Sequence, residues 1–124
     1  TTNGFPNCFF LGFTQGAVTV NVPHALNEQA KHISHLLAEV RTRGEHTVEA
    51  TPEGEQGWLD EVQRTSRFGE RFRAECTPGY YNNEGKQANP NGFFTSGYGG
   101  GPIKFFRILE QWRENGTFDG VKIG

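Results

Sequence analysis

Hydrophobic side chains are scarce in this sequence of 124 residues, where they make up 34% of all positions. Globular domains typically contain about 45–50% apolar residues, in a count that also includes glycine. Long hydrophobic runs are absent too, since the strongest run is only Cys8-Phe9-Phe10-Leu11 and a bilayer span needs roughly 18–20 residues. The composition therefore predicts a thin core and no membrane span.

Cysteine occurs only twice, at Cys8 and Cys76, far apart and outside any CxxC or cysteine/histidine ligand pattern. This spacing favours two reduced thiols over a disulfide. No basic stretch followed by an apolar stretch opens the chain, so no secretion signal is predicted. These features together predict an intracellular, cytoplasmic protein.

An excess of charge is also missing, because 12 Lys and Arg residues interleave with 14 Asp and Glu residues. A nucleic-acid partner is therefore not expected. No GxGxxG or GxxxxGK[ST] segment occurs, so this chain alone builds no dinucleotide or nucleotide phosphate site.

Glycine and phenylalanine are the residues in excess. The 17 glycines amount to about twice the usual share of roughly 7%, and there are 11 phenylalanines. A chain rich in both glycine and aromatic residues does not have the composition of disorder. Aromatic rings are therefore expected to replace missing aliphatic side chains in the core.

The first part of the chain predicts a strand and a long helix. The apolar run at residues 8–11 ends at Gly12 and is typical of a central parallel strand buried on both faces. From Pro23 to Arg43 the apolar residues recur at helical spacing instead. Asn21 stands at an N-cap position, and Gly44 follows as a stop.

Two further helices are predicted downstream. Residues 46–50 have an extended pattern, and Thr51-Pro52 starts a helix that carries Trp58 and continues to Phe72. Pro102 opens the third helix, at Ile103–Glu114, and residues 118–123 alternate as a terminal strand. An irregular stretch of about 25 residues, rich in glycine and tyrosine, separates the second and third helices.

Three histidines fall on the first predicted helix: His24, His32 and His35. Imidazoles three positions apart can share a metal ion, but no cysteine pair, HExxH motif or carboxylate set completes such a site here. We therefore predict no metal site. His24 lies in the first helical turn, where anions and electron-rich ring edges are favoured, although a capping or packing role is more common.

Two loops carry residues suited to a ligand. The loop Gly12-Phe13-Thr14-Gln15-Gly16 follows the carboxyl end of the predicted strand, where open α/β sheets place ligands, and an ordinary strand-to-helix connection has the same pattern. Tyr80, Tyr81, Asn82 and Asn83 suit either the recognition of a ligand edge or the pinning of a surface loop. The aromatic residues of the helices, Trp58 among them, are expected to pack in the core.

Four blocks of sequence are distinctive: residues 3–12, 21–33 and 75–85, and the stretch from Tyr98 through Trp112-Arg113 to Phe118-Asp119-Gly120. In this order they resemble the C-terminal part of flavin-dependent Baeyer–Villiger monooxygenases. The resemblance covers nearly all of the chain. It implies that residues 7–12 form the last strand of a Rossmann-like FAD domain.

The resemblance also implies functional roles for both loops. The first loop and the following helix start are expected to lie beside the pyrimidine end of the flavin. Residues 77–85 are similar to a mobile loop that closes over NADPH and substrate. The expected cofactor-binding residues are Gly12, Phe13, Thr14, Gln15, Asn21 and His24, and the expected substrate-binding residues are Tyr80, Tyr81, Asn82 and Asn83. No residue is assigned a catalytic role.

The predicted fold class is an α/β fragment, mostly helical, with a terminal Rossmann-like strand, three helices and a long loop. We divide it into residues 1–44, a strand and helix of the FAD-binding domain; residues 45–76, a connecting strand and the second helix; and residues 77–124, the lid-like loop, third helix and C-terminal strand.

The predicted function is that of one part of an FAD- and NADPH-dependent enzyme that inserts one oxygen atom of O2 into a ketone, giving an ester or lactone. Both dinucleotide fingerprints and the FxGxxxHxxxW signature of the family are absent, so the isolated chain is not expected to turn over. The partner is then the remainder of the FAD and NADP domains. The alternative is a stand-alone truncated relative that acts as a small-ligand-binding or a non-redox protein and self-associates.

Overall fold

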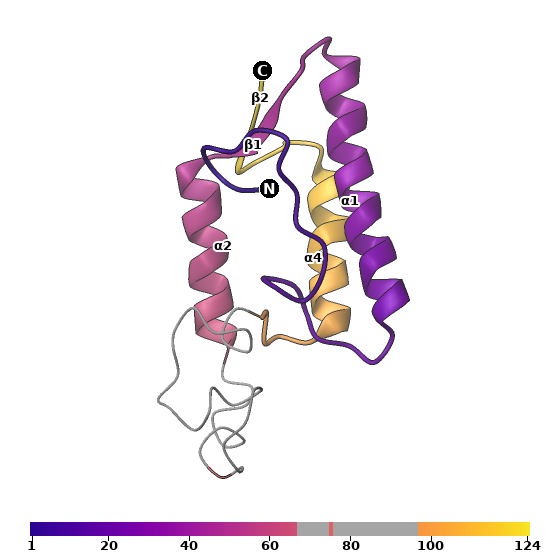
Figure 1. Ribbon diagram of the computed structural model, residues 1–124, viewed down its shortest axis with the longest axis vertical. Coiled ribbons are helices and arrows are strands. Elements are labelled where there is room, and N and C mark those ends of the chain that lie inside the picture. Colours follow the sequence, from indigo (N-terminus) through magenta and orange to yellow (C-terminus); the bar gives the residue numbers. More distant parts are fainter. Residues whose placement is uncertain (67–74, 76–96) are drawn as a thin grey trace.

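Three helices and two short strands make up the described part of the chain, which in this computed structural model comprises residues 1–66, 75 and 97–124. In chain order the elements are α1 (Val22–Thr42), β1 (Val48–Ala50), α2 (Pro52–Thr65), α4 (Pro102–Asn115) and β2 (Val121–Ile123). Helices α1 and α4 pack against each other, and α2 lies across the N-terminal segment from them (Figure 1). The predominance of helix confirms the prediction of a mostly helical chain.

The helix starts confirm the capping signals of the sequence. At α1 the side chain of Asn21 accepts a hydrogen bond of 3.1 Å from the backbone N–H of His24. At α2 the hydroxyl of Thr51 accepts one of 3.0 Å from Gly54 N–H. Each bond pairs a backbone donor that the helix itself leaves free. The second helix is described to Thr65, and its predicted continuation to Phe72 lies outside the described residues.

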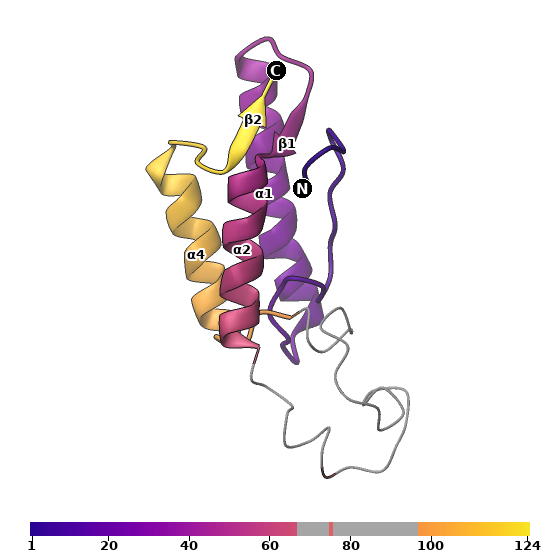
Figure 2. The same cartoon turned by 90° about the vertical axis from the view of Figure 1, so that its left-hand side faces the viewer.

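The strands β1 and β2 join distant parts of the sequence. They pair antiparallel, with Val48 opposite Ile123 and Ala50 opposite Val121. Figure 2 shows this pair at one end of the helices, beside the N-terminal end of α2 and the C-terminal ends of α1 and α4. The extended character predicted for residues 46–50 and 118–123 is thereby confirmed for three residues of each segment.

Two apolar clusters form the core, and aromatic rings occupy both. One contains Ala17, Val62, Tyr98 and Phe105 and lies near the loop that precedes α1. The other contains Leu36, Val40, Val48 and Phe118 and lies beneath the strands. The rings supply volume that this glycine-rich chain lacks in aliphatic side chains.

The predicted buried strand at residues 8–11 is absent from the structure. Phe10 is 67% exposed and Leu11 is 54% exposed, and neither belongs to a strand. Asn7, which precedes this run, is bonded to β1 through Asn7 N–H to Val48 O at 2.9 Å and Val48 N–H to Asn7 Oδ1 at 3.0 Å, and Asn3 Nδ2 donates to Ala50 O at 3.0 Å. A central parallel strand needs neighbours, and the strands of the described residues pair with each other. The described residues therefore show no Rossmann-like sheet.

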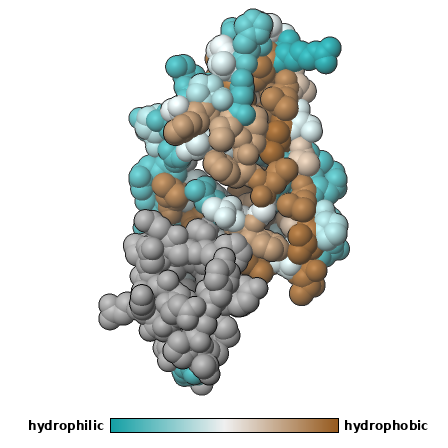
Figure 3. Space-filling model, in the orientation of Figure 1, coloured by the Kyte–Doolittle hydropathy of each residue, from teal (hydrophilic) through white to brown (hydrophobic). Residues whose placement is uncertain are grey.

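The surface in Figure 3 carries hydrophobic side chains along its middle and toward α1. The exposed large apolar residues of the N-terminal segment, residues 1–21, are Phe5, Phe10, Leu11, Val18 and Val20. No helix among the described residues is long and apolar enough to span a membrane. The division into residues 1–44, 45–76 and 77–124 stays a prediction.

Candidate functional site

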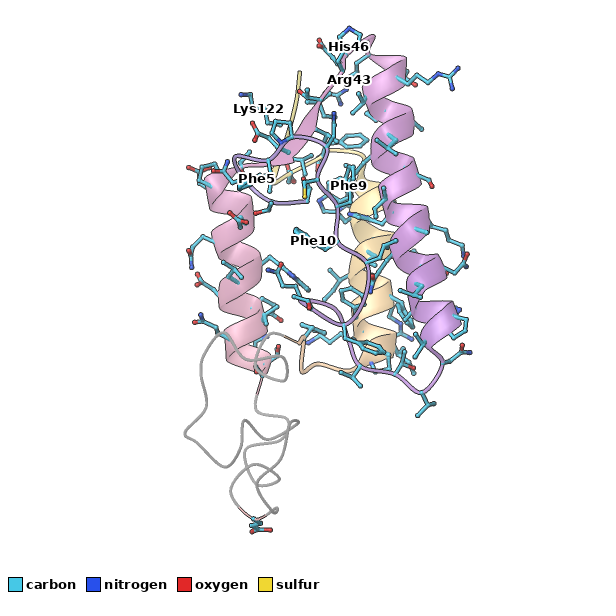
Figure 4. The ribbon with its side chains drawn as sticks, viewed as in Figure 1. Phe5, Phe9, Phe10, Arg43, His46 and Lys122 are labelled. Carbon is cyan, nitrogen blue, oxygen red and sulfur yellow. The ribbon has the colours of Figure 1, made fainter. Side chains whose placement is uncertain are left out.

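A cavity of about 700 Å³ opens between the three helices and the N-terminal segment. Its walls are mostly apolar, with Phe10 from the segment, Leu36 from α1, Trp58 from α2 and Leu109 from α4. In Figure 4, Phe9 lies on the side of α1 and α4, whereas Phe10 lies in the space facing α2. An apolar wall with few polar groups is typical of a small-molecule site.

The loop at residues 12–16 borders this cavity with an unusual backbone. Gly12 has φ +133° and Gln15 has φ +58°, a value that side-chain-bearing residues rarely adopt. The turn is closed by a hydrogen bond of 3.1 Å from Gly16 N–H to Phe13 O. Thr14, Gln15 and Gly16 line the cavity, so two of the six predicted cofactor residues lie on its wall.

Gln29 on α1 holds the loop in place, a role that the sequence analysis missed. Its amide N–H donates to Gly12 O at 2.8 Å, and its oxygen accepts from Gly12 N–H at 2.8 Å. The residue is 9% exposed. A signal was available, because Gln29 is a polar residue on the helix face that also carries the buried Ala25 and Leu36.

Two more elements contact the same loop. Trp58 Nε1–H on α2 donates to Gln15 O at 3.2 Å, and Tyr98 N–H, just before α4, donates to Gly16 O at 2.9 Å. The rings of Trp58 and Tyr98 are stacked, with centroids 5.5 Å apart and planes 21° apart. Trp58 thus packs against the core as predicted and also fixes a loop backbone, which its spacing alone did not indicate.

The other predicted cofactor residues lie off the cavity wall. Gly12 is joined to Gln29, and the carbonyl of Phe13 closes the turn. Asn21 caps α1, and the exposed His24 meets the ring of Phe106 edge-on at 4.9 Å. At the helix start, Asn21 therefore has a capping role and His24 a packing role. Tyr80, Tyr81, Asn82 and Asn83 lie outside the described residues.

Among the titratable groups of residues 1–66, 75 and 97–124, His32 has the largest shift in pKa, and it lies on the cavity wall. Its ring lies 4.8 Å from that of Trp112, and its Nδ1 has no hydrogen-bond partner among the described residues. Burial lowers the pKa of His32 to about 4, and the positive charge of Arg113 acts in the same direction. The imidazole is therefore neutral near pH 7.

His35 belongs to the same aromatic group but stacks on Phe118, with centroids 5.4 Å apart. No group of three or more histidine, cysteine or carboxylate residues in the described part of the chain could hold a metal ion.

No family model matches this chain, but individual relatives do. It is 46% identical over 112 residues to neopentalenolactone D synthase of Streptomyces avermitilis, covering 90% of this chain and 19% of that protein. It is 42% identical over 114 residues to a Baeyer–Villiger monooxygenase of Streptomyces coelicolor, covering 92% and 18%. It is 34% identical over 135 residues to an FAD-binding monooxygenase of Penicillium brasilianum, covering 98% and 21%.

The solved structures that resemble this chain are also monooxygenases. A polycyclic ketone monooxygenase from the thermophilic fungus Thermothelomyces thermophila matches 99% of this chain and 20% of its own, with a TM-score of 0.83 and 27% identity. An oxidized steroid monooxygenase bound to NADP shares the fold over 97% of this chain, with a TM-score of 0.65 and 23% identity. The resemblance in the sequence is confirmed: the chain is homologous to Baeyer–Villiger monooxygenases and spans about a fifth of their length.

Proposed function

We propose that this chain is one part of an FAD- and NADPH-dependent Baeyer–Villiger monooxygenase, which inserts one oxygen atom of O2 into a ketone. The observation that carries the proposal is the match over nearly the whole chain, in sequence and in fold. One relative is named FAD-binding, and one neighbour is bound to NADP. The remaining four-fifths of such an enzyme would supply the rest of both cofactor domains.

Within that enzyme we assign the loop at residues 12–16 to the flavin. Thr14 and Gln15 are exposed on the cavity wall and offer a hydroxyl and an amide, the donor and acceptor types that a flavin ring edge requires. The glycines of the loop leave room for a close approach. Bound flavin supplies the oxidation chemistry, and this chain contributes position and shape.

We assign the apolar cavity to the ketone substrate. Phe10, Trp58 and Leu109 give it a surface that favours a hydrocarbon skeleton over a charged one. The solved neighbour named for polycyclic ketones is consistent with a bulky apolar substrate. Tyr80, Tyr81, Asn82 and Asn83 are proposed to contact the substrate from the loop outside the described residues.

The test is to express the complete reading frame that carries these residues. We expect a yellow protein with bound flavin that oxidises NADPH faster when an apolar polycyclic ketone is added and forms a product heavier by one oxygen atom. The 124-residue chain alone serves as the control and should show no turnover. A flavin-free complete protein would overturn the proposal, and would favour the alternative of a non-redox ligand-binding protein, which the comparisons do not support.

A further inference from the structure

The loop at residues 12–16 lines the cavity and combines two positive φ values with no regular secondary structure. Gln15 holds φ +58° although it carries a side chain, and such a conformation is strained. A strained backbone persists only where its surroundings hold it. The contacts that do so here therefore decide the geometry of the proposed flavin-facing wall.

Among those contacts, Gln29 makes the most specific one. Its carboxamide pairs with both the N–H and the C=O of Gly12, each at 2.8 Å, so the backbone of Gly12 cannot rotate without losing both bonds. The helix α1 that carries Gln29 is anchored independently, through Leu36 and Val40 in the second core cluster. A rigid helix thus presents one buried amide to one residue of the loop.

Gly16 shows how closely the loop follows this amide. A Cβ placed on Gly16 would lie 2.9 Å from Gln29 Nε2 and 2.8 Å from Gly12 O, closer than real Cβ contacts come. Gly16 N–H is bonded to Phe13 O, and Gly16 O accepts from Tyr98 N–H at 2.9 Å. Gln29 therefore bonds to Gly12 at one end of the turn that presents Thr14 and Gln15 to the cavity, and it leaves no room for a side chain at Gly16 at the other end.

We propose that Gln29 is a positioning residue for flavin binding: it holds the loop at residues 12–16 in the strained conformation that places Thr14 and Gln15 on the cavity wall. The inference rests on the proposed function, because the loop is assigned to the flavin there. Gln29 also lines the cavity, but both of its hydrogen bonds go to Gly12, and through them it acts on the loop. Its loss should weaken the cofactor more than it weakens the fold.

The test replaces Gln29 by Met in the protein from the complete reading frame. Methionine keeps the length and helix propensity of glutamine but removes both hydrogen bonds. We expect the Kd for FAD, measured by fluorescence titration of the apoprotein, to rise about tenfold or more. Deuterium exchange of the amides at residues 12–16 should become faster in the same variant, with no flavin present.

Two controls separate positioning from general destabilisation. Val40→Ala removes buried volume in the second core cluster and should lower Tm at least as much, with the FAD Kd unchanged within twofold. Gln63→Met makes the same chemical change at an exposed site on α2 and should alter neither quantity.

The outcomes distinguish the inference from the function on which it rests. An apoprotein of the wild-type sequence that binds no FAD would overturn both. Wild-type protein that binds FAD, together with a Gln29→Met variant of unchanged FAD Kd, would overturn the positioning role alone. An equal rise of the FAD Kd in Val40→Ala would also overturn it, because that rise would follow stability and not the loop.

Discussion

The indole N–H of Trp58 donates a hydrogen bond of 3.2 Å to the carbonyl oxygen of Gln15, which lies 43 positions earlier in the chain. This bond crosses from α2 to the loop that precedes α1 and borders the cavity. Through it a residue of the predicted core helix holds the backbone of a predicted cofactor residue. Changes at this contact should therefore alter the loop before they alter the helix.

Replacing Trp58 by Phe removes the indole donor but keeps a ring that can stack on Tyr98. We expect a loss of about 0.5–1.5 kcal/mol in the free energy of unfolding, the usual value of one net hydrogen bond, and faster amide exchange at residues 12–16. Denaturant unfolding and deuterium exchange provide the measurements.

Trp112→Phe is the matched control for this prediction, because Trp112 Nε1–H donates to Asp119 O at 3.0 Å, away from the loop. It should lose similar stability and leave exchange at residues 12–16 unchanged. If amide exchange at residues 12–16 were equally fast in the Trp58→Phe and Trp112→Phe variants, a specific role for Trp58 would be contradicted.

Gly16→Ala should destabilise the protein by about 1–3 kcal/mol, because the new Cβ would overlap Gly12 O and Gln29 Nε2. Gly57→Ala is its counterpart in the interior of α2, where a Cβ meets no atom within 4 Å. Since alanine favours helix over glycine, Gly57→Ala should raise stability by about 0.5–1 kcal/mol. Thermal unfolding measures the stability of both variants. If both substitutions raised stability, or both lowered it, the close packing around Gly16 would be contradicted.

The free energy of unfolding should decrease as the pH is lowered, because His32 titrates. Its folded pKa of about 4 lies below the unfolded value of 6.5, so the unfolded chain binds the proton more tightly. The contribution is complete above pH 6.5 and is lost as the pH falls toward 4, with a total of about 1–3 kcal/mol.

The variant His32→Phe, which keeps a ring beside Trp112, should show a shallower fall in unfolding free energy between these pH values. His46→Asn, a change at an exposed site, should retain the wild-type slope. Parallel curves for His32→Phe and wild type would rule out the burial of His32 as the cause.

Leu36→Ala should cost about 2–5 kcal/mol, because Leu36 is 2% exposed within the second core cluster. Its neighbour Leu37 is 45% exposed, and Leu37→Ala should change the unfolding free energy by no more than about 0.5 kcal/mol. Urea denaturation of both variants compares them. A loss at Leu37 as large as that at Leu36 would mean that a further part of the protein covers Leu37.

The helices could be predicted from the sequence because their signals are local. Asn21 and Thr51 cap the next backbone donors within three residues, and the apolar spacing of α1 lies within one continuous segment. The strand predicted at residues 8–11 does not form among the described residues, for the opposite reason. Its apolar run indicates side chains suited to burial, whereas a strand also requires a pairing partner, and the described residues supply none.

The candidate site likewise contains residues that the sequence predicted and one that it missed. The place of Thr14 and Gln15 before a helix start, together with the family resemblance, predicts a ligand-facing loop, and both residues do line the cavity. Gln29 was missed because its partner, Gly12, lies 17 positions away and no motif joins the two.

By itself, then, the sequence determined the three helix starts, the resemblance to a monooxygenase family and the lack of a self-contained dinucleotide motif, all of which depend on neighbouring residues or their order. Only the tertiary structure decided that Gln29, Trp58 and Tyr98 converge on one loop. Hydrogen bonds between distant segments depend on how the helices pack, and that packing sums many weak contacts that no short stretch of sequence contains.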